Sequence, residues 1–560
     1  MSITTIESDE LIDIDSPFRV SAGPGAGKTY WLTQHIHNVV RTSDKLFITK
    51  KVLCLTYTNN AVKTIRLRLG NANSRVEVMT IHSFFYHHIV KPYISVIAEE
   101  FNLDVTKIDG HDDKILSNYT FLKELSEKPK VSYVSLENKP KMVDAIKRCY
   151  WHFDSNNNLV IKPSHPVKIG RYNLSNTTYS EYKKLAWEKG VYHHDDIIFF
   201  AYQIINQAPF IIKIISEKFP YVFIDEFQDS TPLQIHIFKD IAEYSTIGVI
   251  GDQAQSIYGF QGAKPTDFHD LVIDNIQNFQ ITNNRRCSNE IVSFLNFIRH
   301  DLMQIPIRNI SDLKPIILVG DMVNAYNYAY RINKNITTLS RSNIVLNLAK
   351  AELGLGGFNK KLLEKLVEED SNQVRSKLIS SSIKSLFLLQ NGDFKEAIKE
   401  LQRSYPNKDL QTKKLILNYL TKLSANFETI EKQSLLEFSI FIVGLTGLSF
   451  PKVTRGRIRR FYEENDFISL YLCVKAVNED SRHLTIHKAK GNEFDNVLLL
   501  LSDPKHLAFI THPDLTKEEQ RINYVAVSRA RNKLFISVPI LEDSLKQQLL
   551  GTGILEVVEI

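Results

Sequence analysis

Short, mostly apolar runs that end in polar or glycine-rich loops recur along the chain, and segments with apolar residues at helical spacing follow them. The runs at residues 18–20, 52–55, 221–224 and 247–250 have the length of strands. Because these runs hardly alternate with polar residues, they are typical of strands buried on both faces of a parallel sheet. The order of strand, loop and helix predicts an α/β fold.

Two stretches depart from this pattern. From about residue 86 to 190, charged and asparagine-rich pieces such as 154–158 alternate with short helical stretches. From about residue 350 to 481, apolar residues such as Leu362, Leu366 and Ile398 recur at helical spacing, which more often marks a core than a site. We predict that both stretches are inserted, mainly helical subdomains.

The bulk composition limits the class of protein. A chain of 560 residues is too long for one hydrophobic core and predicts three or four domains. No run of 18 apolar residues predicts a membrane span, and the acidic first 15 residues do not resemble a secretory signal. Four cysteines without a CxxC pair favour a reducing cytoplasm over a disulfide framework or zinc site. The net charge of +6 permits a nucleic-acid partner without requiring one.

Residues 21–30 form a glycine-rich loop between an apolar run and a helical segment. In this context the glycines let backbone N–H groups surround phosphate oxygens, and the following helix points its positive end at the same anion. Lys28 would reach the β- and γ-phosphates, and the Thr29 hydroxyl would ligate Mg²⁺. The strict pattern has glycine at position 22, and the alternative is a glycine-rich turn before a core helix. The candidate nucleotide-binding residues are Ala22, Gly23, Pro24, Gly25, Ala26, Gly27, Lys28, Thr29 and Tyr30.

Two carboxylates, Asp225 and Glu226, emerge at the end of the apolar run 221–224. In a nucleotide hydrolase Asp225 would enter the Mg²⁺ shell, and Glu226 would orient and deprotonate the attacking water. The alternative is an acidic helix cap. The glycine-rich loop weakens that alternative, because both features need the same parallel sheet.

The run at 247–250 also ends in a polar loop, which contains Gln255 and is followed by Tyr258 and Phe260. The neutral amide of Gln255 would contact a γ-phosphate or the attacking water. We infer that one loop reads both the phosphate state and a stacked base.

Aromatic residues also follow two other strand-like stretches, at Tyr57 and at His82 and Phe84. Side chains at the carboxyl edge of a parallel sheet can stack on bases. For Tyr57, packing in the core and contact with a ligand are equally supported. For residues 78–85, a helix start that packs Phe84 and Phe85 inside is an equally good alternative.

Two further segments allow a functional and a plain interpretation. Residues 193–196 hold two histidines and two aspartates, but adjacent side chains on a helix point to different faces, so a helix with an acidic first turn is favoured over a metal site. The basic run from Lys452 to Arg460 precedes Phe461 and Tyr462. A phosphate-backbone contact and a solvated basic edge explain this run equally well.

Together these motifs resemble those of the UvrD/Rep (PcrA-like) family of superfamily 1 DNA helicases, in the same order, over residues 20–534. Several motifs in order are far more specific than any one of them. The matching segments are residues 21–30, 56–59, 80–84, 225–229, 251–258, 284–287, 339–343, 485–494 and 523–530.

The resemblance implies an α/β fold with two RecA-like parallel-sheet motor domains of the P-loop NTPase class, each with a mainly helical insertion. It also implies ATP and Mg²⁺ as cofactors, and 3′–5′ movement along single-stranded DNA. We expect the first motor domain at residues 1–85 and 191–272 with its insertion at 86–190, and the second at 273–350 and 482–560 with a reduced insertion at 351–481.

The resemblance assigns roles to particular residues. Arg286 and Arg529 would face the γ-phosphate from the second motor domain and stabilise the transferred charge, and Glu493 would hold the ribose. The catalytic set is then Lys28, Asp225, Glu226, Gln255, Arg286 and Arg529, with Thr29 and Asp225 on the metal ion. The single strand would follow Tyr57, Thr58, His82, Phe84, Tyr258, Phe260 and His487.

The sequence departs from the family pattern around the base. No glutamine precedes Gln34, although the family reads adenine with an upstream glutamine. Tyr30 and Arg285 stand where the family has an arginine and a tyrosine around the adenine, so the two residue types are exchanged. We hypothesise that the cation–aromatic sandwich is retained with its partners swapped. Gln261 replaces a usual arginine, which predicts altered coupling to DNA.

Within the family, the chain most resembles the helicase-like subunit of Gabija anti-phage systems. The similarity rests on the short chain, residues 80–94, the pair Arg286 and Cys287, and the early end after residue 530. It implies a hetero-oligomer with a GajA-type partner, an OLD-family ATPase–TOPRIM nuclease. Cutting of DNA would come from that partner, because no nuclease-like carboxylate cluster follows Arg529.

Two functions therefore remain. The first is an ATP-driven translocase or helicase on single-stranded or partially duplex DNA, acting in an anti-phage defence complex. The second is a subunit that senses nucleotide or DNA ends and regulates a partner nuclease with little unwinding of its own. Lys28, Glu226 and Arg529 favour an active ATPase in either case.

Overall fold

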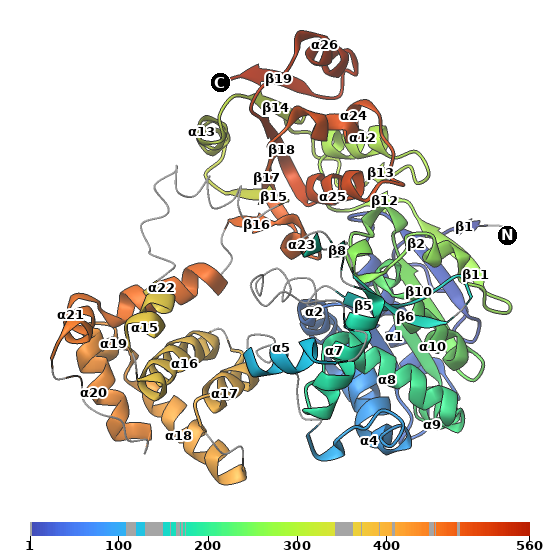
Figure 1. The fold of residues 1–560 in the computed structure, drawn as a ribbon. Helices are drawn as coiled ribbons and strands as arrows, with labels where there is room; N and C mark the ends of the chain where they lie inside the picture. The colour runs from blue at the N-terminus through green and yellow to red at the C-terminus, as the bar shows by residue number, and fades with distance from the viewer. Residues whose placement is uncertain are drawn as a thin grey trace. The chain divides into compact units, whose positions relative to one another are not determined.

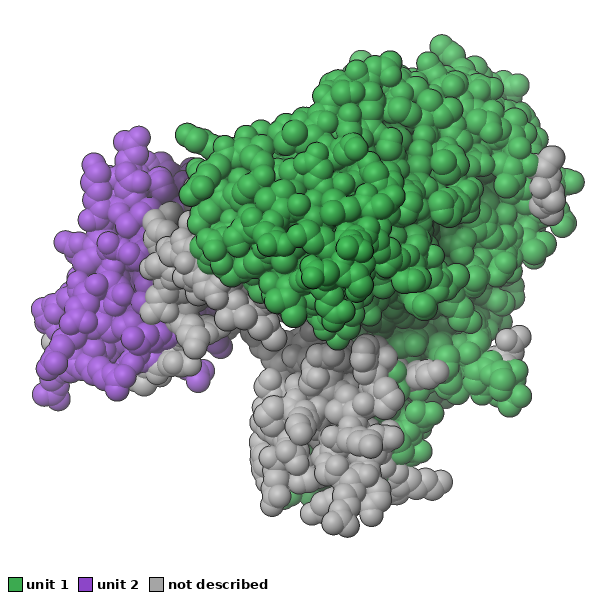
Figure 2. All heavy atoms as spheres, turned by 90° about the horizontal axis from the view of Figure 1, so that it is seen from above, with its two compact units in different colours: residues 1–341, 486–560 green, residues 342–485 purple. Residues whose placement is uncertain are grey.

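A computed structural model of the chain (Figure 1) divides into two compact units, residues 1–341 with 486–560 and residues 342–485 (Figure 2). It describes residues 3–107, 119–128, 131, 149–156, 158–163, 168–169, 172–173, 175–341, 362–370, 372–390, 392–405, 409–446, 453, 455–478 and 482–560. Residues 342 and 343 of the predicted strand motif, and Lys452 of the basic run, lie outside the described residues.

A seven-stranded parallel sheet forms the first half of the larger unit, in the order β1-β11-β2-β10-β9-β3-β4. Its strands are β1 (Ile3–Thr5), β2 (Phe18–Ala22), β3 (Val52–Thr56), β4 (Val76–Thr80), β9 (Tyr221–Ile224), β10 (Thr246–Gly251) and β11 (Gln277–Ile281). All four apolar runs singled out in the sequence are strands of this sheet.

Helices cover both faces of this sheet, which explains why its strands are apolar throughout. Along β3, Val52 and Cys54 pack with one helical layer, and Leu53 and Leu55 pack with the other. The first layer contains α1 (Lys28–Thr42) and α2 (Asn59–Leu69). The second contains α3 (Ile81–Phe84), α4 (Lys91–Tyr93), α8 (His194–Gln207), α9 (Phe210–Lys218), α10 (Pro232–Ala242) and α11 (Asp267–Asp270).

The second sheet has six strands in the order β16-β15-β17-β18-β14-β19, and all of them except β16 lie in the second half of the larger unit. The pairs from β15 to β19 are parallel, so the predicted α/β fold with two parallel sheets is confirmed. The strands are β14 (Ile316–Val319), β15 (Ile336–Ser340), β16 (His483–Thr485), β17 (Phe494–Leu500), β18 (Ala530–Val538) and β19 (Glu556–Glu559). The helices are α12 (Asn289–Ile298), α13 (Met322–Ile332), α23 (Ile486–Ala489), α24 (Ala508–Thr511), α25 (Glu518–Val527) and α26 (Asp543–Gly551).

The described part of the first insertion contains strands as well as helices. Asp154 shapes one turn, because its carboxylate accepts hydrogen bonds from the backbone N–H groups of Asn156 and Asn158, each at 2.8 Å. This asparagine-rich turn joins two antiparallel strands that the sequence did not predict. The elements are α5 (Tyr119–Ser126), β5 (Cys149–Phe153) paired with β6 (Leu159–Pro163), β7 (Lys168–Ile169) paired with β8 (Tyr172–Asn173), and α7 (Asn176–Glu188).

The segment at 193–196 is a helix start, as predicted. Asp196 accepts a hydrogen bond from the backbone N–H of His193 at 2.9 Å and forms a buried ion pair with Lys183 at 2.7 Å. Within the described ranges, no group of three or more histidine, cysteine, aspartate or glutamate residues is placed to hold a metal ion.

The smaller unit is helical and packs around its own core. In the basic run, Arg457 pairs with Glu369, and Arg459 pairs with Glu463 at 2.8 Å. These exposed pairs show that part of the run is engaged within the unit. Its helices are α15 (Leu362–Glu369), α16 (Gln373–Gln390), α17 (Phe394–Gln402), α18 (Leu410–Ala425), α19 (Phe427–Ile430), α20 (Leu435–Thr446), α21 (Arg457–Glu464) and α22 (Phe467–Asn478).

No single helix in the described part of the chain is long and apolar enough to cross a membrane. One bent pair, residues 195–207 with 210–218, passes the same test by length and composition. These are α8 and α9, most of whose apolar residues pack in the core of the first sheet, although Phe210 and Ile214 are exposed.

The buried imidazole of His35 predicts an acid-sensitive core. It stacks on Trp31 at 5.2 Å, neither ring nitrogen has a hydrogen-bond partner in the described structure, and burial lowers its pKa to about 4. In the unfolded chain the imidazole binds a proton below about pH 6.5, whereas in the folded protein it does so only below about pH 4. The free energy of unfolding therefore falls as the pH drops from about 6.5 to about 4. From pH 7 to 5 we expect a loss of about 2 kcal/mol that His35→Phe removes.

Chemical denaturation at both pH values measures this loss. His37→Gln, a partly exposed histidine on the same helix, should keep the wild-type pH dependence. An unchanged pH dependence in His35→Phe would contradict the assignment.

Candidate active site

A pocket of about 770 Å³ lies within the larger unit, between the carboxyl ends of strands of the first sheet and segments of the second. It combines residues that are several hundred positions apart. Most of the predicted site residues line it: Gly23, Gly25, Ala26, Gly27, Lys28, Thr29, Tyr30, Tyr57, Thr58, Asp225, Glu226, Gln255, Tyr258, Arg285, Arg286, His487, Glu493 and Arg529. Ala22, Pro24, His82, Phe84 and Phe260 are not among its lining residues.

The glycine-rich loop connects β2 to α1, as the sequence predicted. Gly25 and Gly27 have φ angles of +75° and +84°, a left-handed region in which a side chain is strained. Gly27 is the residue before α1, so the loop leads directly into the positive end of that helix. The Lys28 ammonium donates to the Ala22 carbonyl at 3.1 Å, which keeps it beside the loop.

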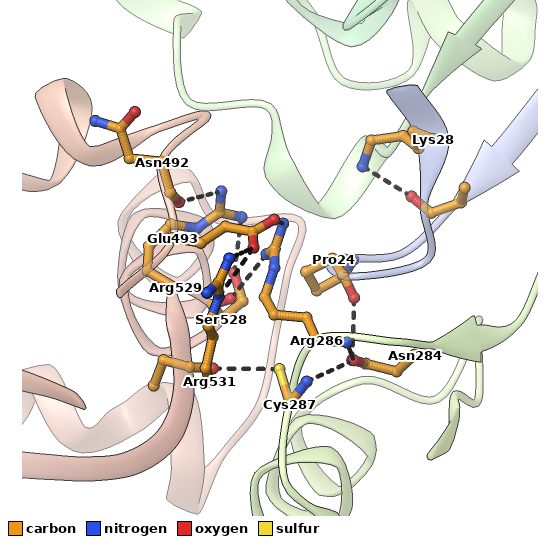
Figure 3. A network of polar contacts seen from close by, with 12 residues as sticks. Pro24, Lys28, Asn284, Arg286, Cys287, Asn492, Glu493, Ser528, Arg529 and Arg531 are labelled. Carbon is orange, nitrogen blue, oxygen red and sulfur yellow. Dashed lines mark hydrogen bonds and ion pairs between the residues drawn. The ribbon is translucent and has the colours of Figure 1, made fainter. Parts of the chain in front are cut away.

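Two amide side chains, Asn284 (Figure 3) and Gln304, hold the loop from outside. The Pro24 carbonyl accepts hydrogen bonds from Asn284 Nδ2 at 3.1 Å and from Gln304 Nε2 at 2.8 Å. Asn284 Oδ1 in turn accepts from the backbone N–H groups of Arg286 and Cys287, each at 2.9 Å. Asn284 therefore ties the loop to the segment that carries Arg286.

The two carboxylates after β9 are adjacent in the chain, and the Asp225 residue is buried whereas Glu226 is partly buried. Burial and the neighbouring Glu226 raise the pKa of Asp225. Burial would also raise the pKa of Glu226, but Lys28 and Lys490 outweigh this effect and lower it. Glu226 has a φ of +56°, a backbone strain that is common at functional sites. Glu226 is thus an ionised carboxylate in the pocket, as a general base requires.

Cations from the second half of the chain reach these carboxylates. Lys490 forms an ion pair with Asp229 at 2.5 Å, and both side chains are nearly fully buried. Arg529 Nη2 donates to Gln255 Oε1 at 2.8 Å, and its charge also lowers the pKa of Glu226. Lys490 lies in a predicted motif, but nothing in the sequence indicated its partner.

Glu493 lies between two arginines (Figure 3). Its Oε1 pairs with Arg286 Nη2 at 2.6 Å, and its Oε2 pairs with Arg531 Nη2 at 2.8 Å. Although burial opposes it, the charge and hydrogen bonds of Arg286 and Arg531 lower the pKa of Glu493 to about 2. In this structure Glu493 holds Arg286 at the pocket, and its contact with the ribose stays a prediction.

Aromatic residues gather beside the pocket. The rings of Tyr57 and Tyr258 stack at 4.7 Å, and those of Phe260 and His487 lie 5.7 Å apart. The Lys490 ammonium lies 4.8 Å from the centre of the Tyr258 ring. The phenol of Tyr57 hydrogen-bonds to Gln261, the residue that replaces the family arginine. Four of the residues predicted to contact DNA therefore form one cluster.

Three other residues predicted to contact DNA take different positions. Thr58 caps α2, because its hydroxyl accepts from the backbone N–H of Ala61 at 3.2 Å. Phe84 has no exposed surface and packs in the core under the first sheet, so the ring cannot stack on a base. The alternative of a helix start is correct for Phe84. His82 lies in the same short helix and is partly buried.

Tyr30 and Arg285 both line the pocket and are both partly exposed. Arg285 Nη2 lies 3.9 Å from a carboxylate oxygen of Glu7, which also accepts a hydrogen bond from Asn283. The two residues are thus on the same pocket, and an acidic residue, Glu7, lies beside Arg285.

Comparison with known proteins adds family information to this geometry. Residues 5–275 match the UvrD/REP helicase N-terminal domain, and residues 480–537 match the UvrD-like helicase C-terminal domain. The Gabija protein GajB of Bacillus cereus (strain HuB5-5) is 22% identical over 94% of this chain and 92% of its own. The putative ATP-dependent DNA helicase YjcD of Bacillus subtilis (strain 168) is 22% identical over 96% and 79%, respectively. The ATP-dependent DNA helicase Rep of Buchnera aphidicola is 22% identical over 96% and 93%.

Gly25→Ala should disable the glycine-rich loop. An added Cβ would lie 2.6 Å from Asn284 Oδ1 and 2.7 Å from Arg286 Cβ, at a φ that alanine rarely adopts. We expect nucleotide affinity to fall about tenfold or more, measured by titration with a fluorescent ATP analogue.

Gly553→Ala is the matched control, because Gly553 has a φ of +70° with no atom within 4 Å of the added Cβ. It should cost about 1 kcal/mol of stability and leave nucleotide affinity unchanged. Equal affinities in the two variants would contradict the account of the loop.

Proposed function

The chain belongs to the UvrD/Rep family of ATP-dependent DNA helicases, and from this premise we propose that it is a 3′–5′ translocase on single-stranded DNA that serves an anti-phage defence complex. One observation carries the proposal: a single pocket joins the glycine-rich loop and Glu226 of the first sheet to Arg529 of the second half. Such a pocket couples hydrolysis to relative movement of its two walls.

The pocket geometry supports the catalytic roles that we propose for its residues. Lys28 and the loop N–H groups bind the phosphates, and Glu226 takes the proton of the attacking water. Arg286 and Arg529 stabilise the charge of the transferred phosphoryl group, and Gln255 contacts it from the loop after β10. Arg286 changes its contact from Glu493 to phosphate when nucleotide binds, because a polyphosphate is the stronger counter-charge.

Thr29 and Asp225 fit a magnesium ion. Asp225 accepts a hydrogen bond from the backbone N–H of Glu226 at 3.1 Å and forms no ion pair within the described structure, although its exposed fraction is only 2%. A nearly buried carboxylate beside a hydroxyl on a phosphate pocket suits this hard cation. Thr29 and Asp225 would hold the Mg²⁺ ion, which would offset the negative charge of the phosphate groups.

We propose that single-stranded DNA runs along the aromatic cluster. Tyr57, Tyr258, Phe260 and His487 offer ring faces on which bases of any sequence can stack. Tyr258 and Gln255 lie in one loop, so a change at the phosphate reaches the strand path directly. Thr58, which lines the same pocket, and His82 are proposed to border this path, whereas Phe84 lies in the core.

The proposal keeps the domain division expected from the sequence. Residues 1–85 and 191–272 form the first motor domain and residues 273–350 and 482–560 the second, with insertions at 86–190 and 351–481. The seven-stranded and six-stranded sheets, and the separate helical core of the smaller unit, support this division.

Similarity to GajB supports a role in defence with a nuclease partner of the GajA type. A second candidate function is a subunit that senses nucleotide or DNA ends and regulates that partner with little unwinding. Two departures from the family pattern favour this candidate. The exchanged pair Tyr30 and Arg285 alters the base pocket. Gln261, which is hydrogen-bonded to Tyr57, alters the contact with DNA.

ATP hydrolysis with and without single-stranded DNA tests the proposal. We expect strong stimulation by DNA, and a loss of about 10²-fold or more in Glu226→Gln. Glu217→Gln, which removes an exposed carboxylate outside the pocket, should hydrolyse ATP like the wild type. Hydrolysis that stays low until the nuclease is added would favour the sensing subunit. No hydrolysis under any condition would contradict both functions.

Tyr30→Ala and Arg285→Ala test the exchanged sandwich. Each should weaken ATP binding about three- to tenfold, since a partly exposed cation–aromatic contact contributes about 1 kcal/mol. Equilibrium titration with ATP, GTP and CTP measures both affinity and base preference. Unchanged ATP binding in both variants would rule out the sandwich.

A further inference from the structure

Arg299 is an almost fully buried arginine that no sequence motif indicated. It follows the last residue of α12, and its exposed fraction is 4%. Its Nη1 pairs with Asp252 Oδ1 at 2.7 Å, and the Asp252 side chain is completely buried. Its other edge binds Asp301, which is 63% exposed, through Nε at 2.8 Å and Nη2 at 2.9 Å.

Asp252 connects Arg299 to the loop after β10. Its Oδ1 accepts from the backbone N–H of Ala254 at 3.1 Å, and its Oδ2 accepts from the side-chain Nε2 of Gln255 at 2.6 Å. All these contacts use Asp252 as an acceptor. The carboxylate thus holds both the backbone turn and the amide of Gln255.

The hydrogen-bond partners determine which way the Gln255 amide points. An ionised carboxylate only accepts hydrogen bonds, so it must face the NH₂ group. A guanidinium only donates, so Arg529 Nη2, at 2.8 Å, must face the amide oxygen. One further amide N–H remains for a ligand in the pocket that Gln255 lines.

We propose that Arg299 is a positioning residue for hydrolysis, which holds Asp252 as an acceptor and so fixes the amide of Gln255 toward the γ-phosphate. The inference deepens the proposed function and rests on it. Without the guanidinium, Asp252 would be a buried carboxylate lacking its cation, which is costly unless the group takes up a proton. A protonated Asp252 can donate, and the amide then loses its single orientation.

The ion pair of Arg299 with Asp252 also connects the two sheets. Asp252 directly follows β10 of the first sheet, whereas Arg299 directly follows α12, which packs against β18 of the second sheet. The guanidinium also lies 6.0 Å from the ring centre of Tyr524 on α25. A shift of α12 and α25 relative to the first sheet would therefore change the orientation of Gln255.

Arg299→Met tests the inference in the full-length protein. We expect kcat for ATP to fall about tenfold or more, with KM changed less than about threefold, because the contact acts in the transition state. The preference for a non-hydrolysable ATP analogue over ADP should fall as well. A merely structural role would not change that ratio in folded protein.

Three further variants separate positioning from folding. Asp301→Asn, on the exposed edge of the same guanidinium, should hydrolyse ATP like the wild type. Arg299→Lys, which keeps a cation beside Asp252, should recover part of the lost kcat. Arg299→Met with Asp252→Asn removes the uncompensated charge, so its melting temperature should return toward the wild-type value while kcat stays low.

Wild-type kcat and wild-type ATP-to-ADP preference in Arg299→Met, or in the double variant, would overturn the inference. Failure of the proposed function looks different, because the wild-type protein itself would then lack DNA-stimulated hydrolysis.

Discussion

The structure depends on the neutralisation of carboxylates that are buried at the end of β9. Asp225 and Asp229 are buried and Glu226 between them is partly buried, and burying such charges is costly unless cations face them. Lys28 supplies one cation from the first sheet, and Lys490 and Arg529 supply two from the second half of the chain. The same charges that hold the two sheets together therefore place catalytic groups around one pocket.

This charge balance also links the nucleotide to the strand path. The ammonium of Lys490 contacts Asp229, the carbonyl of Gln255 at 2.7 Å, and the face of Tyr258. Asp252, three residues before Gln255 in the same loop, forms an ion pair with Arg299. Gln255 is therefore connected through Lys490 to the ring of Tyr258 and through Asp252 to Arg299 after α12. A phosphate that binds at Gln255 can act on both.

The sequence predicted the parts of the fold that local pattern controls. Buried strands, the loop around Lys28 and the helix start at Asp196 follow from composition over a few residues. The sequence could not show whether Phe84 faces the protein core or the DNA strand, because both orientations fit the same short segment. Pairs such as Arg299 with Asp252, or Asn284 with Pro24, depend on packing between segments 47 and 260 residues apart. The hairpin of β5 and β6 was missed because its turn looks like an irregular polar stretch.

Hydrolysis should require a cation from the second half of the chain in a site that the first sheet provides. Single-turnover hydrolysis by Arg529→Met, measured beside equilibrium ATP binding, tests it most directly. We expect a rate reduced about 10²-fold or more with ATP affinity nearly unchanged, because this cation stabilises the transition state. A wild-type rate in Arg529→Met would show that the first sheet hydrolyses ATP alone and would contradict the account.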